Sequence, residues 1–546
     1  MTTTEGLGET SEGETRPGGA RLRLGNRVVR LVVLAAVFVC AACGLVYELA
    51  LVALGTYLLG SSITQTSIVI SVTLFAMGIG AMAAKPLTRR PVRAFVAVEL
   101  ALAVVGGLSV PVLYAAFAWL HLYTPAMVVV CLLIGGLVGA EIPLLMELMQ
   151  RLRRQRASEA VADINAIDYV GALVGGLAFP FVLLPMAGLL DGMLLVAALN
   201  VVAAWVVGLA LATRATRPGP RVALVTVATA LTGVMLVTMA ARADDFEVTA
   251  RQALYRDPIV HAERSRYQSI VVTEGAIFGP ESSDMRLFLD GDLQFSSIDE
   301  YRYHEMLVHP AMRGGHARVL VLGGGDGLAL REVLRYDDVE EVTLVDLDPA
   351  VVDLARTYEP LRELTDNSFA DPRVEHVAAD AFTWAREHSS SAKGGARPDE
   401  YDVIIADFPD PDSTATAKLY SVEMYSLLRG LLADGGRLTV QSGSPFFAPD
   451  AFWCVDTTVA SAGLHTVPYH ASVPSFGEWG FVLAAEGATP DLALPQERPE
   501  GLRFATDEVL DAAATFPPDR SRREVDVSTL LDPVILDYER RGWVGY

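Results

Sequence analysis

Long apolar runs fill the first half of the chain, from about residue 28 to residue 241, and they constrain the fold more than any other feature of the sequence. Each run is long enough to cross a hydrocarbon core of about 30 Å as a helix. We place seven spans, near 29–59, 64–84, 94–118, 124–148, 160–187, 188–212 and 221–241. After Arg242, charged, aromatic and turn residues return at the frequency of a soluble protein. The sequence therefore predicts an N-terminal α-helical multi-pass membrane domain at residues 28–242, joined to a soluble half.

The N-terminal residues predict a protein that stays in the membrane. Residues 1–27 are rich in Gly, Thr, Glu and Arg and offer little to bury, so we expect a disordered tail. The run that follows is too long for the apolar core of a cleaved signal peptide, and more runs come after it. We therefore expect a multi-pass protein of the cell membrane, with the lipid bilayer as a partner.

Basic residues between the spans bear on orientation. They cluster before the first span and after every second one, at Arg21/Arg23/Arg27/Arg30, Lys85/Arg89/Arg90/Arg93, Arg151/Arg153/Arg154/Arg156 and Arg214/Arg217/Arg221. The positive-inside rule puts these clusters in the cytoplasm. A seventh span would carry the soluble half to the other side, whereas the cofactor inferred below is made in the cytoplasm. Three readings stay open: an external soluble half, a re-entrant or interfacial segment at Leu224–Ala240, or two short passes within 29–59.

Charge and cysteine usage narrow the function classes. The net charge of −22 argues against a nucleic-acid partner, because phosphates require clustered Lys and Arg, and it suits a small cationic substrate. The cysteines, Cys40, Cys43, Cys131 and Cys454, offer no disulfide framework and no paired ligands for a metal knuckle, so we expect no metal site. Carboxylates lie within or at the edges of the apolar runs at Glu48, Glu99, Glu141, Asp163 and Asp168. They indicate either a cation path or pairing between helices.

The soluble half begins with alternating segments, such as 269–273 and 286–290, separated by turns. This pattern predicts a small antiparallel β domain, which we place at residues 243–310. Strand, glycine turn, helix and strand then follow at 318–345 and form one βαβ unit of a parallel sheet.

Further strands are expected at 374–378, 402–406 and 437–441, with helices between them. We therefore expect a C-terminal α/β domain of the Rossmann-like, methyltransferase type at residues 311–495. A polar tail at 496–546 contains prolines, and we assign it no function.

A glycine-rich turn after the first parallel strand carries the strongest local signal. Gly323, Gly324, Gly325 and Gly327 allow a sharp turn and a close ligand, and they aim the next helix N-terminus into the crevice beyond the strand. Asp346 ends the next strand, where it can accept hydrogen bonds from both ribose hydroxyls. Together these residues predict a site for an adenosine nucleoside.

Carboxylates around this turn distinguish among the cofactors that use such a layout. Asp326, inside the turn, would repel a pyrophosphate or the carboxylate of a methionine moiety, but it would attract an amine or a sulfonium. Asp380 would accept a hydrogen bond from the adenine amino group. A later strand runs into a loop with three carboxylates, Asp407, Asp410 and Asp412, which suits cation binding or proton acceptance.

Several segments between about residues 267 and 481 match one known family in a single order. They are Tyr267-Gln268-Ser269-Ile270, Leu289-Asp290-Gly291, Asp299-Glu300-Tyr301-Arg302-Tyr303-His304-Glu305-Met306, the turn Gly323–Gly327 with Arg331-Glu332-Val333-Leu334, Asp346-Leu347-Asp348, Asp371-Pro372-Arg373-Val374, Tyr401-Asp402-Val403-Ile404-Ile405, Asp407 with Asp410-Pro411, and Leu419-Tyr420-Ser421. In these segments the chain resembles the polyamine aminopropyltransferases, or spermidine synthases. The membrane-fused N-terminal half resembles a bacterial branch of that family.

The resemblance implies transfer of an aminopropyl group from decarboxylated S-adenosylmethionine to putrescine or a related amine. The products would be spermidine or an analogue and 5'-methylthioadenosine, and the adenosyl compound would be a co-substrate rather than a permanently bound cofactor. The attacking amine must first lose a proton, and by family position the base is Asp407. Asp410 would hold the distal ammonium, with Tyr303 and His304 lining the amine channel.

The resemblance also implies how the donor is held. Asp326 would bind the amine of the aminopropyl arm, while the nucleoside would lie among Gln268, Gly323, Gly325, Asp346, Asp380 and Ala381. A homo-oligomer is compatible with the sequence.

The family pattern is incomplete in places. Phe408-Pro409 replaces two small hydroxyl-bearing residues, Thr414 a proline, Ala381 a glycine and Asp346 a glutamate, and Phe476 falls near a usual substrate-contacting tyrosine. These departures affect the acceptor amine more than the donor. Two alternatives stay open: a methyltransferase that uses intact S-adenosylmethionine, and a non-catalytic membrane sensor or transporter of polyamines or nucleosides.

Overall fold

The protein consists of two compact units, Met1–Ala253 and Leu254–Tyr546. The structure, a computed structural model, describes residues 26–59, 62–152, 157–212, 218–276, 283–390 and 400–543. The predicted disordered tail lies outside these residues, except that Asn26 and Arg27 already belong to the first helix and are not disordered. The units divide after residue 253 rather than 242, because a short helix that follows the last apolar run packs with the N-terminal unit.

Helices make up the described part of the N-terminal unit. They are α1 (Asn26–Leu59), α2 (Ser62–Ala83), α3 (Pro91–Ala118), α4 (Tyr123–Leu152), α5 (Ala157–Ala178), α6 (Leu184–Ala212), α7 (Pro218–Ala240) and α8 (Ala243–Gln252), with a 3-10 turn η1 (Leu87–Arg89) and a π-helical turn η2 (Phe179–Leu183). Within the described residues, six helical segments are long and apolar enough to cross a membrane: Arg27–Leu58, Thr64–Ala83, Pro91–Ala118, Tyr123–Arg151, Ala162–Ala212 and Gly219–Ala240.

The fifth segment, Ala162–Ala212, explains why seven spans were predicted. It is 51 residues long, or roughly 75 Å at 1.5 Å per residue, which is more than twice a hydrocarbon core. Gly188 interrupts it with a φ of 67°, a left-handed conformation that glycine adopts without strain. This break coincides with the boundary predicted between the spans 160–187 and 188–212. The segment therefore has the geometry of two passes.

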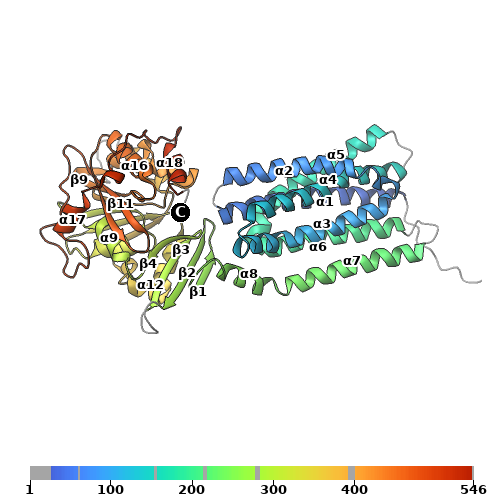
Figure 1. The fold of residues 1–546 in the computed structure, drawn as a ribbon, viewed down its shortest axis with the longest axis horizontal. Coiled ribbons are helices and arrows are strands. Elements are labelled where there is room, and N and C mark those ends of the chain that lie inside the picture. Colours follow the sequence, from blue (N-terminus) through green and yellow to red (C-terminus); the bar gives the residue numbers. More distant parts are fainter. Residues whose placement is uncertain are drawn as a thin grey trace, which may run out of the picture. The chain divides into compact units, whose positions relative to one another are not determined.

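Close contacts between helices hold the N-terminal unit together. Helix α2 packs on α4, α3 packs on α4 and α6, and α1 packs on α5 and α6 (Figure 1). Glycines allow this closeness: a Cβ at Gly80 on α2 would lie 1.9 Å from the carbonyl oxygen of Gly136 on α4. A Cβ at Gly171 on α5 would lie 2.3 Å from the carbonyl oxygen of Phe38 on α1. Small residues at such crossings are typical of helices that pack in membranes.

The continuity of two helices bears on the three alternatives for the side of the membrane on which the soluble half lies. Helix α1 runs without a break for 34 residues, so the reading of two short passes within 29–59 is wrong. Helix α7 is continuous for 23 residues, without the break in the helix that a re-entrant segment would need. Arg30 pairs with Asp163 at 2.5 Å, which joins the basic ends of α1 and α5, and Arg151 donates to the carbonyl of Thr88 at 2.9 Å, which joins the end of α4 to η1.

The C-terminal unit contains two sheets. Strands β1 (Ile259–Arg264), β2 (Ser269–Ala276), β3 (Ser283–Leu289) and β4 (Asp292–Ser296) form an antiparallel sheet in chain order, in the region where such strands were predicted. Helix α9 (Glu300–Val308) leads to a seven-stranded sheet of order β10-β11-β9-β8-β5-β6-β7.

The larger sheet has the predicted Rossmann-like core. Its elements are β5 (Arg318–Gly323), α10 (Leu328–Leu334), β6 (Glu341–Asp346), α11 (Pro349–Thr357), α12 (Glu359–Leu364), η3 (Ser368–Ala370), β7 (Val374–Ala378), α13 (Ala381–Ser390), β8 (Tyr401–Asp407), α14 (Thr414–Ala417), η5 (Lys418–Tyr420), α15 (Val422–Arg429), β9 (Leu432–Gln441), α16 (Pro449–Ser461), β10 (His465–Val473) and β11 (Gly477–Ala485). Strands β9, β8, β5, β6 and β7 are parallel, and the hairpin β10–β11 adds two antiparallel strands at one edge.

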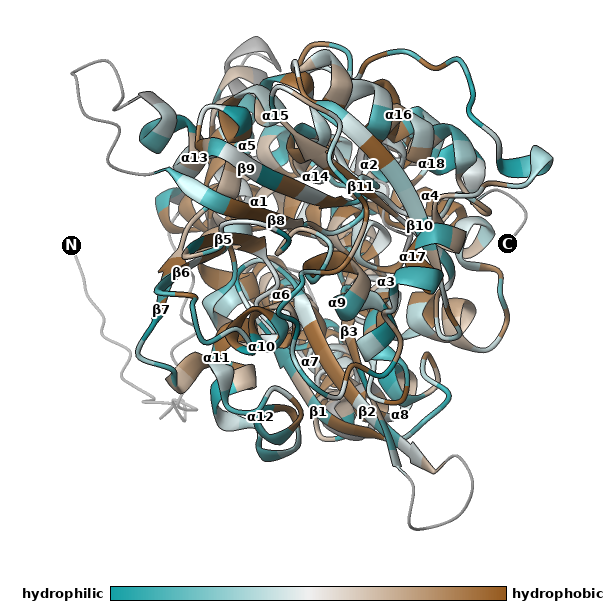
Figure 2. Cartoon of the chain, turned by 90° about the vertical axis from the view of Figure 1, so that its left-hand side faces the viewer, coloured by the Kyte–Doolittle hydropathy of each residue, from teal (hydrophilic) through white to brown (hydrophobic). Residues whose placement is uncertain are grey.

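Strand order creates a crevice at the centre of this sheet. The chain proceeds outward from β5 to β6 and β7, then returns to lay β8 on the other side of β5. Loops leaving β5 and β8 therefore diverge, and α/β sheets bind ligands at such a switch point. The central strands are largely hydrophobic (Figure 2) and are buried on both faces, with Val319 and Val321 in one core and Leu320 and Leu322 in the other.

The polar tail folds onto the sheet. Helices α17 (Asp507–Ala513) and α18 (Val534–Gly542) flank a short turn, η6 (Pro518–Arg520). Leu510 joins one hydrophobic core and Ile535 the other, and both are fully buried. The tail is thus part of the C-terminal unit.

Candidate active site

The glycine turn after β5 has a backbone that only glycine adopts readily. Gly323, Gly324 and Gly327 have φ angles of 82°, 66° and 84°. Space is equally limiting, because a Cβ at Gly323 would lie 2.0 Å from the carbonyl oxygen of Asp407. The sheet register pairs Gly323 with Asp407, so the turn and the end of β8 meet at the switch point.

Asp346, at the end of β6, closes the other side of the turn. Its Oδ2 accepts a hydrogen bond from the amide of Gly325 at 3.0 Å, and its Oδ1 accepts one from the amide of Asp348 at 2.8 Å. Burial raises the pKa of Asp346 to about 6. Each oxygen keeps a lone pair for a ribose hydroxyl.

Gln268 joins this edge through a residue that sequence reasoning did not single out. Its Nε2 donates to Oδ2 of Asp348 at 3.1 Å, and Asp348 also caps α11 by accepting from the amide of Ala350. Asp348 therefore links the antiparallel sheet to the end of β6.

Asp326 lies inside the turn, where Oδ1 accepts a hydrogen bond from the amide of Leu328 at 2.9 Å at the start of α10. The pKa of Asp326 is raised to about 6, mainly by burial, with His304 opposing the rise and Asp407 adding to it. Asp326, Asp407 and His304 are thus close enough to influence one another's charge.

Asp380 follows β7, at the same edge of the sheet, but its oxygens already have protein partners. Oδ1 accepts from the amide and the hydroxyl of Thr383, both at 2.9 Å, and Oδ2 lies 2.6 Å from Nζ of Lys418. Burial would raise the pKa of Asp380, but Lys418 and Thr383 lower it overall. Its role toward adenine, and that of neighbouring Ala381, stay predictions, and an adenine amino group would compete with Lys418.

Asp407 ends β8 and faces both the turn and α9. Its Oδ1 accepts a hydrogen bond from the hydroxyl of Tyr303 at 2.6 Å, while Oδ2 lies 3.2 Å from where a Cβ at Gly324 would be. Burial raises the pKa of Asp407 and Asp346 adds to the rise, whereas His304 and Tyr303 oppose it. A half-buried carboxylate with a raised pKa suits a general base.

His304 places a buried imidazole ring beside these carboxylates. Its Nδ1 lies 2.8 Å from the carbonyl oxygen of Glu300 and 3.0 Å from Oε2 of that residue. Arg331 binds both carboxylate oxygens of Glu300, at 2.9 and 3.0 Å. Burial would lower the pKa of His304, but Glu300, Asp326 and Asp407 raise it overall. These three carboxylates therefore stabilise the protonated ring of His304 more than water does in an ordinary histidine.

Asp410 lies beyond Asp407 in the same loop and is held by Gln441, at the end of β9. Nε2 of Gln441 donates to Oδ1 of Asp410 at 3.0 Å and to the carbonyl of Phe408 at 2.7 Å. Nε1 of Trp479 donates to Oε1 of Gln441 at 3.1 Å and so fixes the amide. Burial raises the pKa of Asp410 to about 6, and nearby aspartates contribute.

The two phenylalanines that depart from the family pattern, Phe408 and Phe476, lie in different parts of the C-terminal unit. Phe408 is buried and its ring lies 6.0 Å from that of Tyr420, so it belongs to the core. Phe476, in the β10–β11 turn, lies 6.3 Å from the ring of Tyr303 and 5.2 Å from that of Trp479. The structure thus brings Phe476 to the predicted amine channel.

Sequence reasoning missed Glu539, on α18. A Cβ at Gly443 would lie 3.9 Å from both Oδ1 of Asp410 and Oε2 of Glu539, so the two carboxylates lie beside the same glycine. Oε1 of Glu539 accepts from Nε1 of Trp543 at 2.5 Å. The pKa of Glu539 is raised to about 8, first by burial and then by the charge of Asp410.

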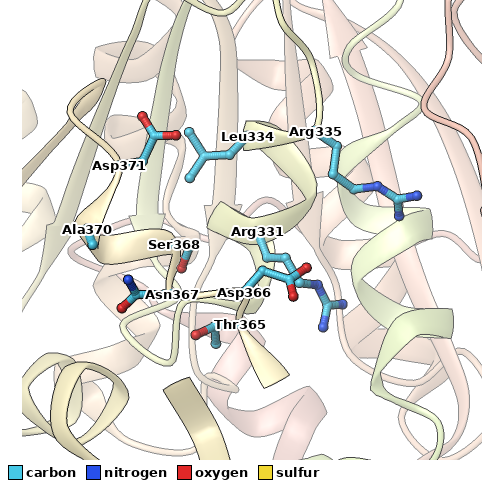
Figure 3. Close-up of a pocket in the computed structure, with 9 residues that line it drawn as sticks. All are labelled: Arg331, Leu334, Arg335, Thr365, Asp366, Asn367, Ser368, Ala370 and Asp371. Carbon is cyan, nitrogen blue, oxygen red and sulfur yellow. The ribbon is translucent and has the colours of Figure 1, made fainter. Parts of the chain in front are cut away.

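A cavity of about 390 Å³ lies elsewhere, on α10 and η3 (Figure 3). Its lining contains none of the predicted site residues. The two guanidinium groups in it are already paired, Arg331 with Glu300 and Arg335 with Glu332. We assign it no role in the site.

Comparison with known proteins gives evidence that is independent of the geometry of the site. Residues 300–494 match the spermine/spermidine synthase domain. The chain is 57% identical over 527 residues to polyamine aminopropyltransferase 1 of Streptomyces coelicolor, covering 95% of this chain and 96% of the relative. It is 45% identical over 550 residues to the polyamine aminopropyltransferase of Mycobacterium tuberculosis, covering all of both chains. It is also 29% identical to the crystal structure of spermidine synthase from Thermotoga maritima, with a TM-score of 0.42, covering 47% of this chain and 84% of that one.

Proposed function

The chain belongs to the polyamine aminopropyltransferase family, and we propose that its C-terminal unit uses Asp407 as the base of that family's reaction. The reaction transfers an aminopropyl group from decarboxylated S-adenosylmethionine to an amine of the putrescine class. Its products are spermidine or an analogue and 5'-methylthioadenosine. Family membership confirms the resemblance found in the soluble half and favours aminopropyl transfer over the methyltransferase and the non-catalytic readings.

One observation carries the choice of base: Asp407 is in register with Gly323 across the switch point and points toward the glycine turn. An ammonium that enters beside Asp407 can give its proton to the carboxylate. The freed nitrogen lone pair then attacks the methylene carbon next to sulfur, and the carbon–sulfur bond breaks with its electrons going to sulfur. Since the sulfonium leaves as a neutral thioether, positioning and deprotonation supply most of the catalysis.

Asp326 supports the assignment of the donor. A buried carboxylate in the turn attracts the amine of the aminopropyl arm, and it repels the additional carboxylate of intact S-adenosylmethionine. Its hydrogen bond from Leu328 holds it in place. Asp346 and Gln268 lie on the nucleoside side of the same turn.

Two buried carboxylates support a separate subsite for the acceptor. We assign the distal ammonium to Asp410 and Glu539, whose carboxylates both lie beside Gly443. Gln441 orients the first and Trp543 the second. Each has a raised pKa because burial disfavours a charge without a counterion, and an ammonium would supply that counterion.

Product analysis on the full-length protein tests the reaction. Detergent-solubilised enzyme given decarboxylated S-adenosylmethionine and a panel of diamines should release 5'-methylthioadenosine. We expect Asp407→Asn to lower kcat by roughly 10²- to 10⁴-fold, the usual contribution of a general base, while binding of the thioadenosine product stays near normal.

Asp412→Asn is the matched control, because it removes one exposed carboxylate from the same loop. It should retain most of the rate. If Asp407→Asn kept the rate as well as the control does, another group would be the base. Release of S-adenosylhomocysteine from intact S-adenosylmethionine would instead reveal methyl transfer.

We place the N-terminal unit in a membrane, on the strength of its surface. Large apolar side chains are exposed on α2, α5 and α7, including Phe75 at 66% and Leu231 at 67%, and water does not favour such a surface. Helix α7 has no charged residue after Arg221, so it lacks the polar face of an interfacial helix.

A membrane-spanning α7 would have a consequence for orientation. The helix ends near Trp119, at the end of α3 away from the basic clusters, because α8 places Phe246 6.2 Å from the ring of Trp119. The chain would therefore continue into the C-terminal unit from the face opposite to the basic clusters. Protease protection in sealed vesicles tests this prediction, because the basic loops and the C-terminal unit should be cleaved from opposite sides of the membrane. Cleavage of both from the same side would mean that α7 does not cross the membrane.

A further inference from the structure

Three metal-ligating groups meet inside the N-terminal unit, although they lie far apart in the sequence. Sγ of Cys40 on α1 and carboxylate oxygens of Glu99 on α3 and Glu141 on α4 all lie within 4.8 Å of one another. All three side chains are buried, with exposures of 2%, 0% and 3%. The sequence predicted no metal site because no cysteine pair was present. Packing of α1, α3 and α4 against one another creates the group (Figure 1).

The charge of this group has no protein counterion among the described residues. The ion pairs in the described part of the N-terminal unit join Arg30 to Asp163 and Arg151 to Glu147, and neither involves the cluster. Removing a carboxylate from water without a partner is strongly unfavourable, by several kcal/mol per ion. The two glutamates therefore require either protons or a bound cation.

The hydrogen bonds favour a metal ion over protons. Glu99 uses Oε1 to accept from the thiol of Cys40 at 3.1 Å. Oε2 of Glu99 and Oε1 of Glu141 are fully buried, yet neither has a hydrogen-bond partner within the described part of the chain. One proton shared between these two oxygens would pair both of them, but it would leave one net negative charge in the apolar interior. A single divalent cation would satisfy both oxygens and neutralise both charges.

The ligand types narrow the choice of cation. Carboxylates alone suit Mg²⁺ or Ca²⁺, but a thiolate ligand selects softer ions such as Zn²⁺. The Sγ–Oε1 distance of 3.1 Å between Cys40 and Glu99 is near the roughly 3.5 Å edge expected of a tetrahedral site with Zn–S of about 2.3 Å and Zn–O of about 2.0 Å.

We propose that Cys40, Glu99 and Glu141 bind one divalent cation of the zinc class within the helical unit. Three protein ligands leave the fourth tetrahedral position open, as in sites that exchange a ligand. Glu99 lies eight residues after the start of α3 and Glu141 eleven before the end of α4, or roughly 12 and 17 Å from the basic end. The ion would therefore sit more than two helical turns inside the ends of α3 and α4, and it would tie α1, α3 and α4 together.

Metal loading of the full-length protein tests the proposal. Detergent-solubilised protein incubated with Zn²⁺ and then dialysed should retain about one ion per chain by elemental analysis. Cys40→Ser, Glu99→Gln and Glu141→Gln should each weaken Zn²⁺ binding by more than the roughly 10- to 100-fold that loss of a ligand-supporting residue brings. Cys131→Ser and Glu147→Gln, on α4 but outside the cluster, should leave it unchanged.

A second readout covers the case in which a variant does not fold. Wild-type protein loaded with Co²⁺ should show a thiolate-to-metal charge-transfer band, which added Zn²⁺ removes. Absence of that band, or loading far below one ion per chain, would overturn the proposal. An infrared carboxylic-acid band that Glu99→Gln and Glu141→Gln abolish would overturn it too, because it would show that protons neutralise the pair. Equal metal loss in the Cys131 and Glu147 controls would place the ion elsewhere.

Discussion

Tyr303 sets the pH at which the proposed base becomes available, and Tyr303→Phe tests this by removing a single oxygen atom. The Tyr303 hydroxyl donates to Oδ1 of Asp407 at 2.6 Å, and this bond stabilises the ionised carboxylate. A hydrogen bond to a charged group contributes about 1.5–3 kcal/mol, and 1.36 kcal/mol corresponds to one pKa unit. Losing it should therefore raise the pKa of Asp407 by about 1–2 units above a value that burial already raises.

The sign of the effect on rate follows from the role of a base. Asp407 accepts a proton only when ionised, so a higher pKa confines activity to higher pH. The acid limb of kcat/KM for the acceptor, measured at saturating donor, should move upward by about 1–2 pH units in the Tyr303→Phe enzyme. The rate above that limb should fall much less than it does in Asp407→Asn.

Tyr301→Phe is the matched control, because it removes a phenolic hydroxyl from the same helix while its ring stays available to Arg503. Its pH profile should overlay that of the unaltered enzyme. An acid limb that does not move in Tyr303→Phe, or moves to lower pH, would refute the reasoning. It would mean either that Asp407 is not the titrating base or that the hydrogen bond does not persist when substrates bind.

Three further perturbations probe other parts of the site. Asp326→Asn should reduce the preference for the decarboxylated donor over S-adenosylmethionine by roughly tenfold, because about 1.4 kcal/mol of charge discrimination is lost. An unchanged preference in competition assays would show that Asp326 does not act by repelling the carboxylate of S-adenosylmethionine. Glu539→Gln should raise the KM of the acceptor but not that of the donor. In the unaltered enzyme, the KM of the acceptor should increase as the pH falls below about 8, because Glu539 then takes up a proton and no longer attracts an ammonium. The Glu539→Gln enzyme should lack this pH dependence. Gly323→Ala should lower the melting temperature more than Gly435→Ala does. Both positions have a φ near 80°, but only at Gly323 would the added Cβ lie 2.0 Å from a carbonyl oxygen. Equal decreases in melting temperature would mean that backbone strain, and not the clash of the Cβ, determines the loss.

The donor half of the site was predictable because its signals are local. Strands β5, β6 and β8 are short, largely apolar runs that end in glycine or aspartate, so the positions of Gly323, Asp346 and Asp407 at one edge follow from strand order in a parallel sheet. The Asp380–Lys418 ion pair was not predictable, since Lys418 approaches from a turn that precedes α15 and only the folded loop brings the two together.

The acceptor half depends on contacts that no local pattern announces. Gln441 reaches Asp410 because β9 pairs with β8, and Phe476 reaches Tyr303 because the β10–β11 hairpin folds back over α9. Glu539 comes from a short polar helix whose apolar face, at Ile535, is too brief to stand out in the sequence.

The N-terminal unit repeats this contrast. The spans follow from hydrophobicity, and even the break at Gly188 falls where the sequence divides two spans. The meeting of Cys40, Glu99 and Glu141 follows only from how three helices pack.

Taken together, the charges of the C-terminal unit couple substrate binding to ionisation. Asp326, Asp407, Asp410 and Glu539 all have raised pKa values because they are buried, and His304 partly offsets the rise at the first two. Donor and acceptor bring a sulfonium and ammonium groups into the same space, and these cations favour the ionised carboxylates. Substrate binding should therefore release protons from the acceptor subsite while it prepares Asp407 to accept one. After transfer the sulfonium charge is gone, so the attraction that held the donor weakens at the moment when the thioether must leave.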